Sequence, residues 1–326
     1  MKPKQRFLDA LNFKKPDDYI SFMEIEFHIY EEYVGRSLQI GYEIASMSPS
    51  EKDIAMHRNA EIMIETAEKA GHDAIMTITG YWELSPGVPA HLWLPDGDTY
   101  KQQLRILKKE CGDRFCIIGH TGPTMGMPDS IHFHEYVYDL YERPDEVKAK
   151  LELKFLNSIE WGNIMIEAGA DCLVNCADLA FNSGPFISPA MCDEFVFPYM
   201  NRWVQDLKSK GIPAIWHTDG NIMPIMDRVL DSGLSAIQCI DPIAGMDIVQ
   251  LKKQVENRLA LIGNINCSNL QLALKTEIDH EVKRVVEGCK GSGGFVLSGC
   301  NAIFRGIPAE NYQVMVDARY KYGSER

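Results

Sequence analysis

An amphipathic helix that ends at a glycine and leads at once into an apolar run recurs four times, over 67–79, 166–178, 207–220 and 229–241. Each apolar run is typical of a strand that is buried on both faces. Helix–strand units of this kind predict parallel strands joined by crossover helices. The glycines stand where a helix C-terminus favours a left-handed residue, and they are Gly71, Gly169, Gly211 and Gly233.

Four further apolar runs, over 19–27, 114–122, 259–266 and 293–301, bring the set to eight. Eight such units predict an α/β fold, a single (β/α)8 TIM barrel over residues 1–326 with an amphipathic N-terminal helix. A doubly wound sheet is the competing fold. No G-x-G-x-x-G follows an early strand, which weakens the dinucleotide-binding version of that competitor.

Short sequence signals predict where two helices begin and which segment forms a lid. Ser188 followed by Pro189 predicts a helix that runs on to Arg202. Residues 50–53 are expected to cap another helix. The stretch 81–112 contains several Pro and Gly residues and follows the second strand. It predicts an elaborated loop and hairpin that covers the mouth of the barrel.

The charge balance narrows the expected partners. The chain has 33 Lys and Arg against 46 Asp and Glu, a net charge of −13. This excess repels nucleic acids and anionic membranes, so neither is expected as a partner. Without a signal-peptide pattern or an apolar run of about 18 residues, we expect a cytoplasmic protein whose nine cysteines are reduced thiols. A homodimer is the assembly that we consider.

Polar residues gather at the C-terminal ends of the predicted strands, where the active sites of TIM barrels lie. We expect catalytic roles for His217, Asp219, Asp178 and Glu26. We expect substrate contacts from Glu24, His28, Tyr81, Trp82, His120, Asn175, Asn182, Gln238 and Asn264. Alternate residues of a strand face opposite sides, so for each residue a structural hydrogen bond is the alternative.

His217 and Asp219 form the sharpest cluster. They lie two residues apart on one strand, so both side chains can converge on one ligand or ion. Together with Cys300 at the end of the last strand, they make a candidate zinc site with an open position for substrate. The alternative is that His217 and Asp219 bind an organic substrate and Cys300 is a bystander.

Carboxylates at two other strand ends are candidates for acid–base chemistry. Asp178 could orient substrate or move a proton, or it could cap the following loop. Glu24, Glu26 and His28 share one side of the first strand. Either this set faces the cavity or most of it faces the helices.

The strings NSGPFISPAMCDEFVFPY (182–199) and IWHTDGNIMPIMDRVLDSG (215–233) resemble the uroporphyrinogen decarboxylase superfamily. RFLDALNFKKPDD near the start, ALIGNINC and the closing PAENYQVMVDARYKYG extend the resemblance over most of the chain. The resemblance implies a single-domain (β/α)8 enzyme. The superfamily holds the porphyrin decarboxylase and also methyltransferases that serve corrinoid proteins.

Departures from the family patterns indicate the branch. The decarboxylase proper carries an arginine pair near its N-terminus that grips substrate carboxylates, whereas the first strand here carries Glu24 and Glu26, which repel a polycarboxylate. The thiol methyltransferases carry His-x-Cys and a distant Cys that hold zinc. This chain keeps His217 and Cys300 but has Asp219 in place of the first cysteine.

The H-T-D-G turn looks more like the relatives that pass methyl groups from methoxylated donors to a corrinoid protein. The resemblance therefore implies a methyltransferase that moves a methyl group from a small, methoxylated aromatic donor to the cobalt of a partner corrinoid protein. His217, Asp219 and a zinc ion would stabilise the leaving oxygen, and Tyr81 and Trp82 could pack the donor. The alternatives are a decarboxylase, a zinc-dependent thiol methyltransferase and a non-catalytic binding barrel.

Overall fold

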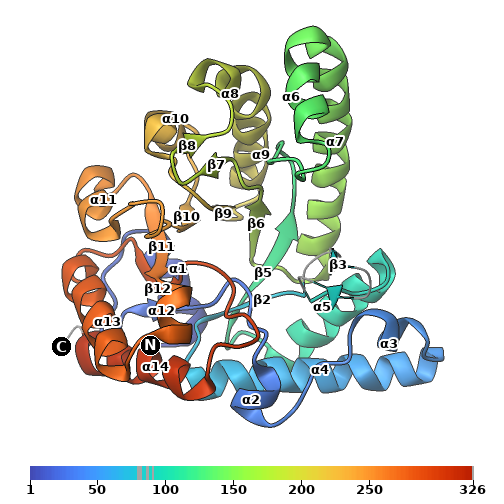
Figure 1. The fold of residues 1–326 in the computed structure, drawn as a ribbon. Coiled ribbons are helices and arrows are strands. Elements are labelled where there is room, and N and C mark those ends of the chain that lie inside the picture. The colour runs from blue at the N-terminus through green and yellow to red at the C-terminus, as the bar shows by residue number, and fades with distance from the viewer. Residues whose placement is uncertain (79–82, 86–87, 90–91, 325–326) are drawn as a thin grey trace.

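Parallel strands form a barrel at the centre of the structure (Figure 1). The computed structural model describes residues 1–78, 83–85, 88–89 and 92–324. The barrel strands are β1 (Ser21–Phe22), β2 (Ala74–Met76), β5 (Cys116–Thr121), β6 (Cys172–Cys176), β9 (Ala214–Thr218), β10 (Ala236–Cys239), β11 (Ala260–Ile265) and β12 (Phe295–Gly299). Two antiparallel hairpins pair β3 (Glu83–Ser85) with β4 (Val88–Pro89) and β7 (Ala180–Phe181) with β8 (Gly184–Pro185).

Helices surround the barrel and alternate with its strands along the chain (Figure 1). The helices are α1 (Pro3–Leu11), α2 (Tyr30–Val34), α3 (Gly41–Ala45), α4 (Pro49–Ala70), α5 (Gly97–Cys111), α6 (Phe133–Glu142), α7 (Pro144–Ala168), α8 (Pro189–Phe195), α9 (Phe197–Ser209), η1 (Met223–Ile225), α10 (Met226–Asp231), α11 (Ile248–Val255), α12 (Cys267–Leu272), α13 (Lys275–Cys289) and α14 (Ala309–Tyr322). Within the described ranges, no helix combines the length and the apolar character that crossing a membrane requires.

The order of strands around the barrel is β1-β12-β11-β10-β9-β6-β5-β2. Asp73, the residue before β2, joins β2 to β1 and so closes the barrel. Its N–H donates to the carbonyl of Phe22 at 2.7 Å, and its Oδ2 accepts from the N–H of Phe22 at 3.2 Å. Each of the eight predicted apolar runs contains one barrel strand. The predicted TIM barrel is confirmed.

Side chains fill the barrel from both ends. Alternate strand residues such as Met23, Ile215 and Val296 point inward, and Phe7 and Leu11 of α1 pack against this inner cluster. The opposite faces of the strands pack against the helices. Because the N-terminal helix fills one end, the open mouth lies at the other end, where the strands have their C-termini.

The glycines that end the repeated helices adopt the predicted left-handed conformation. Their φ angles are +75° at Gly71, +118° at Gly169, +70° at Gly211 and +76° at Gly233. Gly71 is also constrained by space, since a Cβ there would lie 2.0 Å from Oη of Tyr320. The helix–strand boundaries were therefore predictable from local backbone preference.

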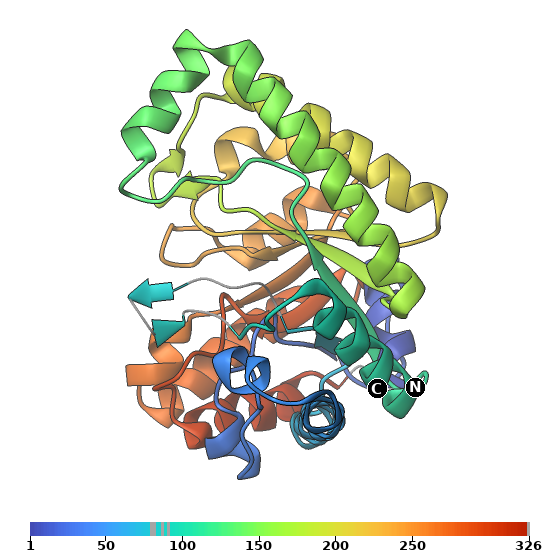
Figure 2. The same ribbon diagram turned by 90° about the vertical axis from the view of Figure 1, so that its right-hand side faces the viewer.

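Three local predictions differ from the structure. The hairpin of the expected lid is present as β3–β4. Figure 2 shows both hairpins on the side away from the two termini. Residues 97–111, however, form a helix rather than the expected loop. Asp96 begins that helix by accepting from the N–H of Thr99 at 2.7 Å. The cap of α4 is Ser48, two residues before the expected 50–53.

The helix predicted from Ser188 to Arg202 begins as expected, because Oγ of Ser188 accepts from the N–H of Met191. It is interrupted at Val196, between α8 and α9. Pro198 lies two residues later and lacks the N–H that would continue the helical ladder.

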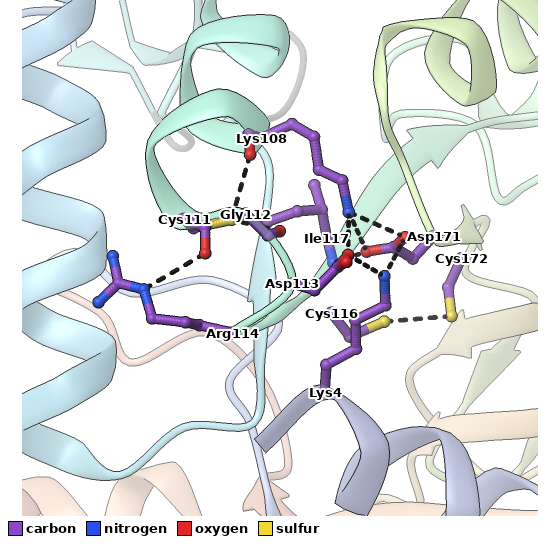
Figure 3. A network of polar contacts seen from close by, with 10 residues as sticks. All are labelled: Lys4, Lys108, Cys111, Gly112, Asp113, Arg114, Cys116, Ile117, Asp171 and Cys172. Carbon is purple, nitrogen blue, oxygen red and sulfur yellow. Dashed lines mark hydrogen bonds and ion pairs between the residues drawn. The ribbon is translucent and has the colours of Figure 1, made fainter. Parts of the chain in front are cut away.

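Ion pairs attach α1 to the closed end of the barrel, as Figure 3 shows. Nζ of Lys4 lies 2.8 Å from Asp171 and 3.0 Å from Asp113, and Nζ of Lys108 lies 3.3 Å from both aspartates. Asp171 also accepts from the N–H of Ile117 at 3.0 Å. This network ties a helix, a loop and a barrel strand together at the surface.

A second, buried network lies beside it. Arg6 of α1 binds both oxygens of Asp18 at 2.8 and 2.9 Å and contacts Asp73 at 2.5 Å. Arg319 of α14 lies 3.8 Å from Asp73 and donates twice to the carbonyl of Ile20. Asp73 is fully buried, and its carboxylate faces the guanidinium groups of Arg6 and Arg319, which are 9% and 1% exposed.

We expect Asp73→Ala to lower the free energy of unfolding by about 3–5 kcal/mol, because it leaves Arg6 and Arg319 buried without their shared carboxylate. Asp113→Ala is the matched control. The Asp113 side chain is 76% exposed, so its ion pairs contribute at most about 1 kcal/mol. Urea unfolding followed by circular dichroism measures both values. Equal losses in the two variants would contradict the buried role of Asp73.

Candidate active site

Asp178, His217 and Asp219 form a compact group at the open mouth. One ligand atom from each lies within 4.8 Å of the others, and within the described part of the chain no other such group of His, Cys, Asp or Glu residues is found. Nε2 of His217 is 3.7 Å from Oδ1 of Asp178 and 3.7 Å from Oδ1 of Asp219. These distances are too long for hydrogen bonds and leave a space between the three atoms.

Strand register brings this group together. His217 lies near the end of β9, between Cys176 of β6 and Gln238 of β10. Ile215 faces the barrel interior, so His217 and Asp219 on the same side face the mouth. Asp178 follows β6 by two residues, and its Oδ1 accepts from the N–H of Asp219 at 3.0 Å.

Gln238 sets the orientation of the His217 ring. Its Nε2 donates to the carbonyls of Gly299 at 3.2 Å and Cys300 at 3.5 Å. Since those oxygens can only accept, Oε1 must be the atom that meets Nδ1 of His217. Nδ1 therefore carries a proton, and Nε2 points toward the two aspartates.

The two oxygens of Asp219 have different surroundings. Oδ2 accepts from Nδ2 of Asn301 at 2.7 Å. Oδ1 is buried and has no hydrogen-bond partner among the described residues. Burial raises the pKa of Asp219, and the neighbouring carboxylate of Asp178 acts in the same direction, while His217 opposes them. An electropositive atom at the centre of the group would satisfy both Oδ1 and Nε2 of His217.

A cleft of about 630 Å3 opens beside the group. Asp178, Asp219 and Asp241 line it together with Asn182 and the ring of Phe181, which is 46% exposed. None of its described lining residues is a lysine or an arginine. The cleft therefore disfavours polyanions and accepts neutral or cationic molecules with an apolar part.

The compact group found in the structure does not include Cys300, which was expected beside His217 and Asp219. Its Sγ lies 3.8 Å from Sγ of Cys267, and Asp178 occupies the third place in the group instead. The carbonyl groups of Gly299 and Cys300 hold Gln238. The residues present are one imidazole and two carboxylates.

Three predicted substrate contacts are buried amides. Gln238 is 1% exposed and lies behind His217. Nδ2 of Asn175 donates to Oγ1 of Thr124 at 2.8 Å, and Nδ2 of Asn264 donates to the carbonyl of Ile240 at 2.8 Å. The structure thus places these three amides where they hold strands and loops in position.

The remaining predicted residues fall in different places. Asn182 lines the cleft. His120 follows Ile118 by two residues on β5, so it projects toward the mouth. Glu24 is buried between β1 and β12, and Glu26 pairs with His28 at 2.7 Å. The two predicted aromatic contacts, Tyr81 and Trp82, lie outside the described residues.

Three further residues lie at the site. Cys176 is the register partner of His217, Asn301 binds Asp219, and Asp241 accepts from the N–H of Gly220 at 3.2 Å. Each lies at the C-terminal end of a strand that the sequence predicts, so its position along the chain was the only sign that it could belong to the site. Which of these side chains meet depends on register and loop path.

A model of the family "Uroporphyrinogen decarboxylase (URO-D)" matches residues 84–322. The chain belongs to the URO-D family. The match includes the barrel strands from β5 to β12 and every residue of the Asp178–His217–Asp219 group, while β1 and β2 precede it. The resemblance noted in the sequence is confirmed.

Members of the URO-D family with different activities are similar to this chain. Uroporphyrinogen decarboxylase of Pelobacter propionicus is 26% identical over 220 residues, which are 65% of this chain and 62% of that protein. Methylcobamide:CoM methyltransferase MtaA of Methanosarcina barkeri is 24% identical over 222 residues, 68% of this chain and 62% of that protein. The matches span less than two thirds of the length of these relatives.

A solved structure, described as a methyltransferase from Methanosarcina mazei, superposes with a TM-score of 0.76 over 99% of both chains at 18% sequence identity. At this identity the likeness shows the barrel fold alone. The activity has to be argued from the site.

We expect Gln238→Leu to release the His217 ring from its single tautomer, because Leu offers no acceptor to Nδ1–H. Nitrogen NMR of histidine-labelled protein should show Nδ1–H alone in the wild type and a mixture with Nε2–H in the variant. Gln250→Leu, an exposed position, is the control. An unchanged ring spectrum in Gln238→Leu would contradict the assigned role.

Proposed function

We propose that this URO-D family protein is a methyltransferase that moves a methyl group from a small donor to the cobalt of a partner corrinoid protein. The observation that carries the proposal is the acidic cleft beside His217, with no described cation to bind the carboxylates of a porphyrinogen. Similarity to a methylcobamide methyltransferase supports the same branch.

The donor that we propose is a methoxylated aromatic compound. Phe181 is exposed in the cleft, and its ring centre lies 6.1 Å from that of Phe133. Such rings can pack a flat donor. Asn182 beside Phe181 supplies a polar group for the substituents of that donor.

The Asp178–His217–Asp219 group fits a divalent cation. Its donors are one nitrogen and two oxygens, and one of the oxygens, Oδ1 of Asp219, is buried without a hydrogen-bond partner among the described residues. Zinc accepts such a set and keeps an open position for substrate. When bound there, the ion would act as a Lewis acid on the leaving oxygen of the donor.

The surrounding residues hold this arrangement without further movement. Gln238 orients the ring of His217, and Asn301 holds one oxygen of Asp219. The N–H of Asp219 fixes Asp178. Preorganised groups of this kind stabilise the charge that develops on the leaving oxygen.

Decarboxylation is the second candidate, because several relatives are named uroporphyrinogen decarboxylase. Transfer to a thiol is a third, since the methyltransferase MtaA is also similar. The replacement of thiolate ligands by Asp178 and Asp219 argues against thiol activation. A homodimer and a cytoplasmic location stay predictions.

We expect transfer of methyl groups to free cob(I)alamin from at least one member of a methoxyarene panel. Asp219→Ala should lower kcat/KM at least about 100-fold, because the leaving oxygen loses its stabilisation. Asp227→Ala, which changes an exposed aspartate, should leave the rate unchanged. Release of CO2 from a porphyrinogen, without methyl transfer from any donor, would contradict the proposal.

We also expect the purified chain to bind about one divalent ion, measured by mass spectrometry of the metal content. His217→Ala and Asp178→Ala should lose the ion, whereas Cys300→Ser should retain it. Loss of metal in Cys300→Ser with retention in Asp178→Ala would restore the ligand set expected from the sequence.

A further inference from the structure

Glu24 lies buried at the seam between β1 and β12, where the sequence led us to expect a substrate contact. The residue is 4% exposed. Its Oε2 accepts from the N–H of Gly299 at 2.9 Å and from Oγ of Ser298 at 3.1 Å. A carboxyl group is costly to bury, and the reaction proposed above does not use this one. Its contacts with β12 therefore call for a role of their own.

The side chain of Glu24 continues a connection that the backbones of β1 and β12 begin. The paired residues of these two strands end at Phe22 and Leu297. The N–H of Met23 adds one more bond, to the carbonyl of Leu297 at 3.1 Å. Gly299 lies two residues beyond Leu297, and its N–H donates to the carboxyl group of Glu24. The end of β12 nearest the mouth is thus held to β1 by a side chain.

Gly299 carries this connection on to His217. The carbonyl of Gly299 accepts from Nε2 of Gln238 at 3.2 Å, and Oε1 of Gln238 contacts Nδ1 of His217. Glycine has the widest choice of backbone angles, so the bonds on its two sides fix its peptide groups. Glu24, Gly299, Gln238 and His217 are all buried. A continuous series of buried hydrogen bonds therefore joins Glu24 to the imidazole at the mouth.

The residues that follow Gly299 hold a second member of the group. Nδ2 of Asn301 donates to Oδ2 of Asp219 at 2.7 Å. The segment packs closely on itself, because a Cβ at Gly299 would lie 3.1 Å from the carbonyl of Asn301 and 3.2 Å from Sγ of Cys267. A shift of Gly299 would therefore be felt at both His217 and Asp219.

We propose that Glu24 is a positioning residue, which fixes Gly299 and thereby sets the orientation of His217 and Asp219 at the mouth. It does so without touching the donor or an ion. Groups that orient ligands from behind typically change metal affinity or activity about 10–100-fold when they are removed. The proposal rests on the methyl transfer proposed above only where turnover is measured.

The role requires an acceptor oxygen at position 24, and two substitutions isolate that requirement. Burial raises the pKa of Glu24 to about 8, although the bonds from Gly299 and Ser298 oppose the shift. The uncharged acid therefore predominates at pH 7, and Gln matches its shape and charge and keeps an oxygen that accepts. Leu has a similar size but no acceptor, so Glu24→Leu leaves the N–H of Gly299 unpaired.

NMR of metal-free protein with labelled histidines tests the positioning without turnover. The proton on Nδ1 of His217, assigned by its absence in His217→Ala, should exchange with solvent at least about tenfold faster in Glu24→Leu than in the wild type. Glu24→Gln should exchange at the wild-type rate, because Gly299 keeps its acceptor. Ser298→Ala is the matched control, since it removes the other bond to Oε2 and leaves Gly299 paired, and it should also keep the wild-type rate.

Three results of this experiment would overturn the proposal. They are a wild-type rate in Glu24→Leu, equally fast exchange in Glu24→Gln and Glu24→Leu, and equally fast exchange in Ser298→Ala. Circular dichroism shows whether each variant is folded. If Glu24→Leu does not fold, Glu24→Asp takes its place, because its shorter side chain withdraws the acceptor from Gly299 and should give the same faster exchange.

Zinc titration and turnover measure the consequence at the mouth. Glu24→Leu should weaken the binding of zinc about 10–100-fold and lower kcat/KM for methyl transfer to free cob(I)alamin by a similar factor, whereas Glu24→Gln should restore both. Wild-type zinc affinity and wild-type turnover in Glu24→Leu would overturn the positioning role. A wild type that transfers no methyl group from any donor would overturn the proposed function alone, because the exchange rates of the metal-free protein still decide the role of Glu24.

Discussion

Asp73 joins β1 to β2, the two strands at which the barrel closes, and the rest of the structure depends on that junction. Its backbone N–H and its carboxylate both bond to Phe22, so β1 and β2 meet around a single residue. The same carboxylate neutralises Arg6, which anchors the helix that fills the closed end, and faces Arg319 of the last helix. A fully buried charge is costly unless it is paired, and here it is shared by the first strand, the second strand and both terminal helices. The carboxylate that joins β1 to β2 therefore also holds the helix that fills the closed end of the barrel.

The end of β12 plays a comparable part at the open mouth. The N–H of Gly299 binds Glu24, and its carbonyl accepts from Gln238, which in turn holds His217. Asn301, two residues later, binds Asp219. One short segment thus links the buried carboxyl at the seam to the group at the mouth. Because the backbone of Gly299 makes two of these four hydrogen bonds, the geometry of the site depends on the path of the chain there.

The charge of the mouth supports the proposed methyl transfer over the decarboxylation for which the family is named. Three carboxylates, those of Asp178, Asp219 and Asp241, line the cleft. A tetra-acid or octa-acid substrate would meet repulsion there, whereas a neutral methylated donor would not. The same carboxylates replace thiolates around His217. That replacement favours oxygen-rich coordination and a Lewis-acid role over activation of a thiol.

The sequence by itself determined the eight strands, the glycines that end the helices and the pairing of His217 with Asp219 on one face. These features depend on local periodicity and backbone preference, which neighbouring residues carry. Only the tertiary structure decided that Asp178 rather than Cys300 completes the group, that Gln238 lies behind His217, and that Glu24 turns toward β12. Those outcomes depend on the register between strands that are distant in sequence and on the paths of the loops. The alternation of residues along one strand specifies neither the register nor the loop paths.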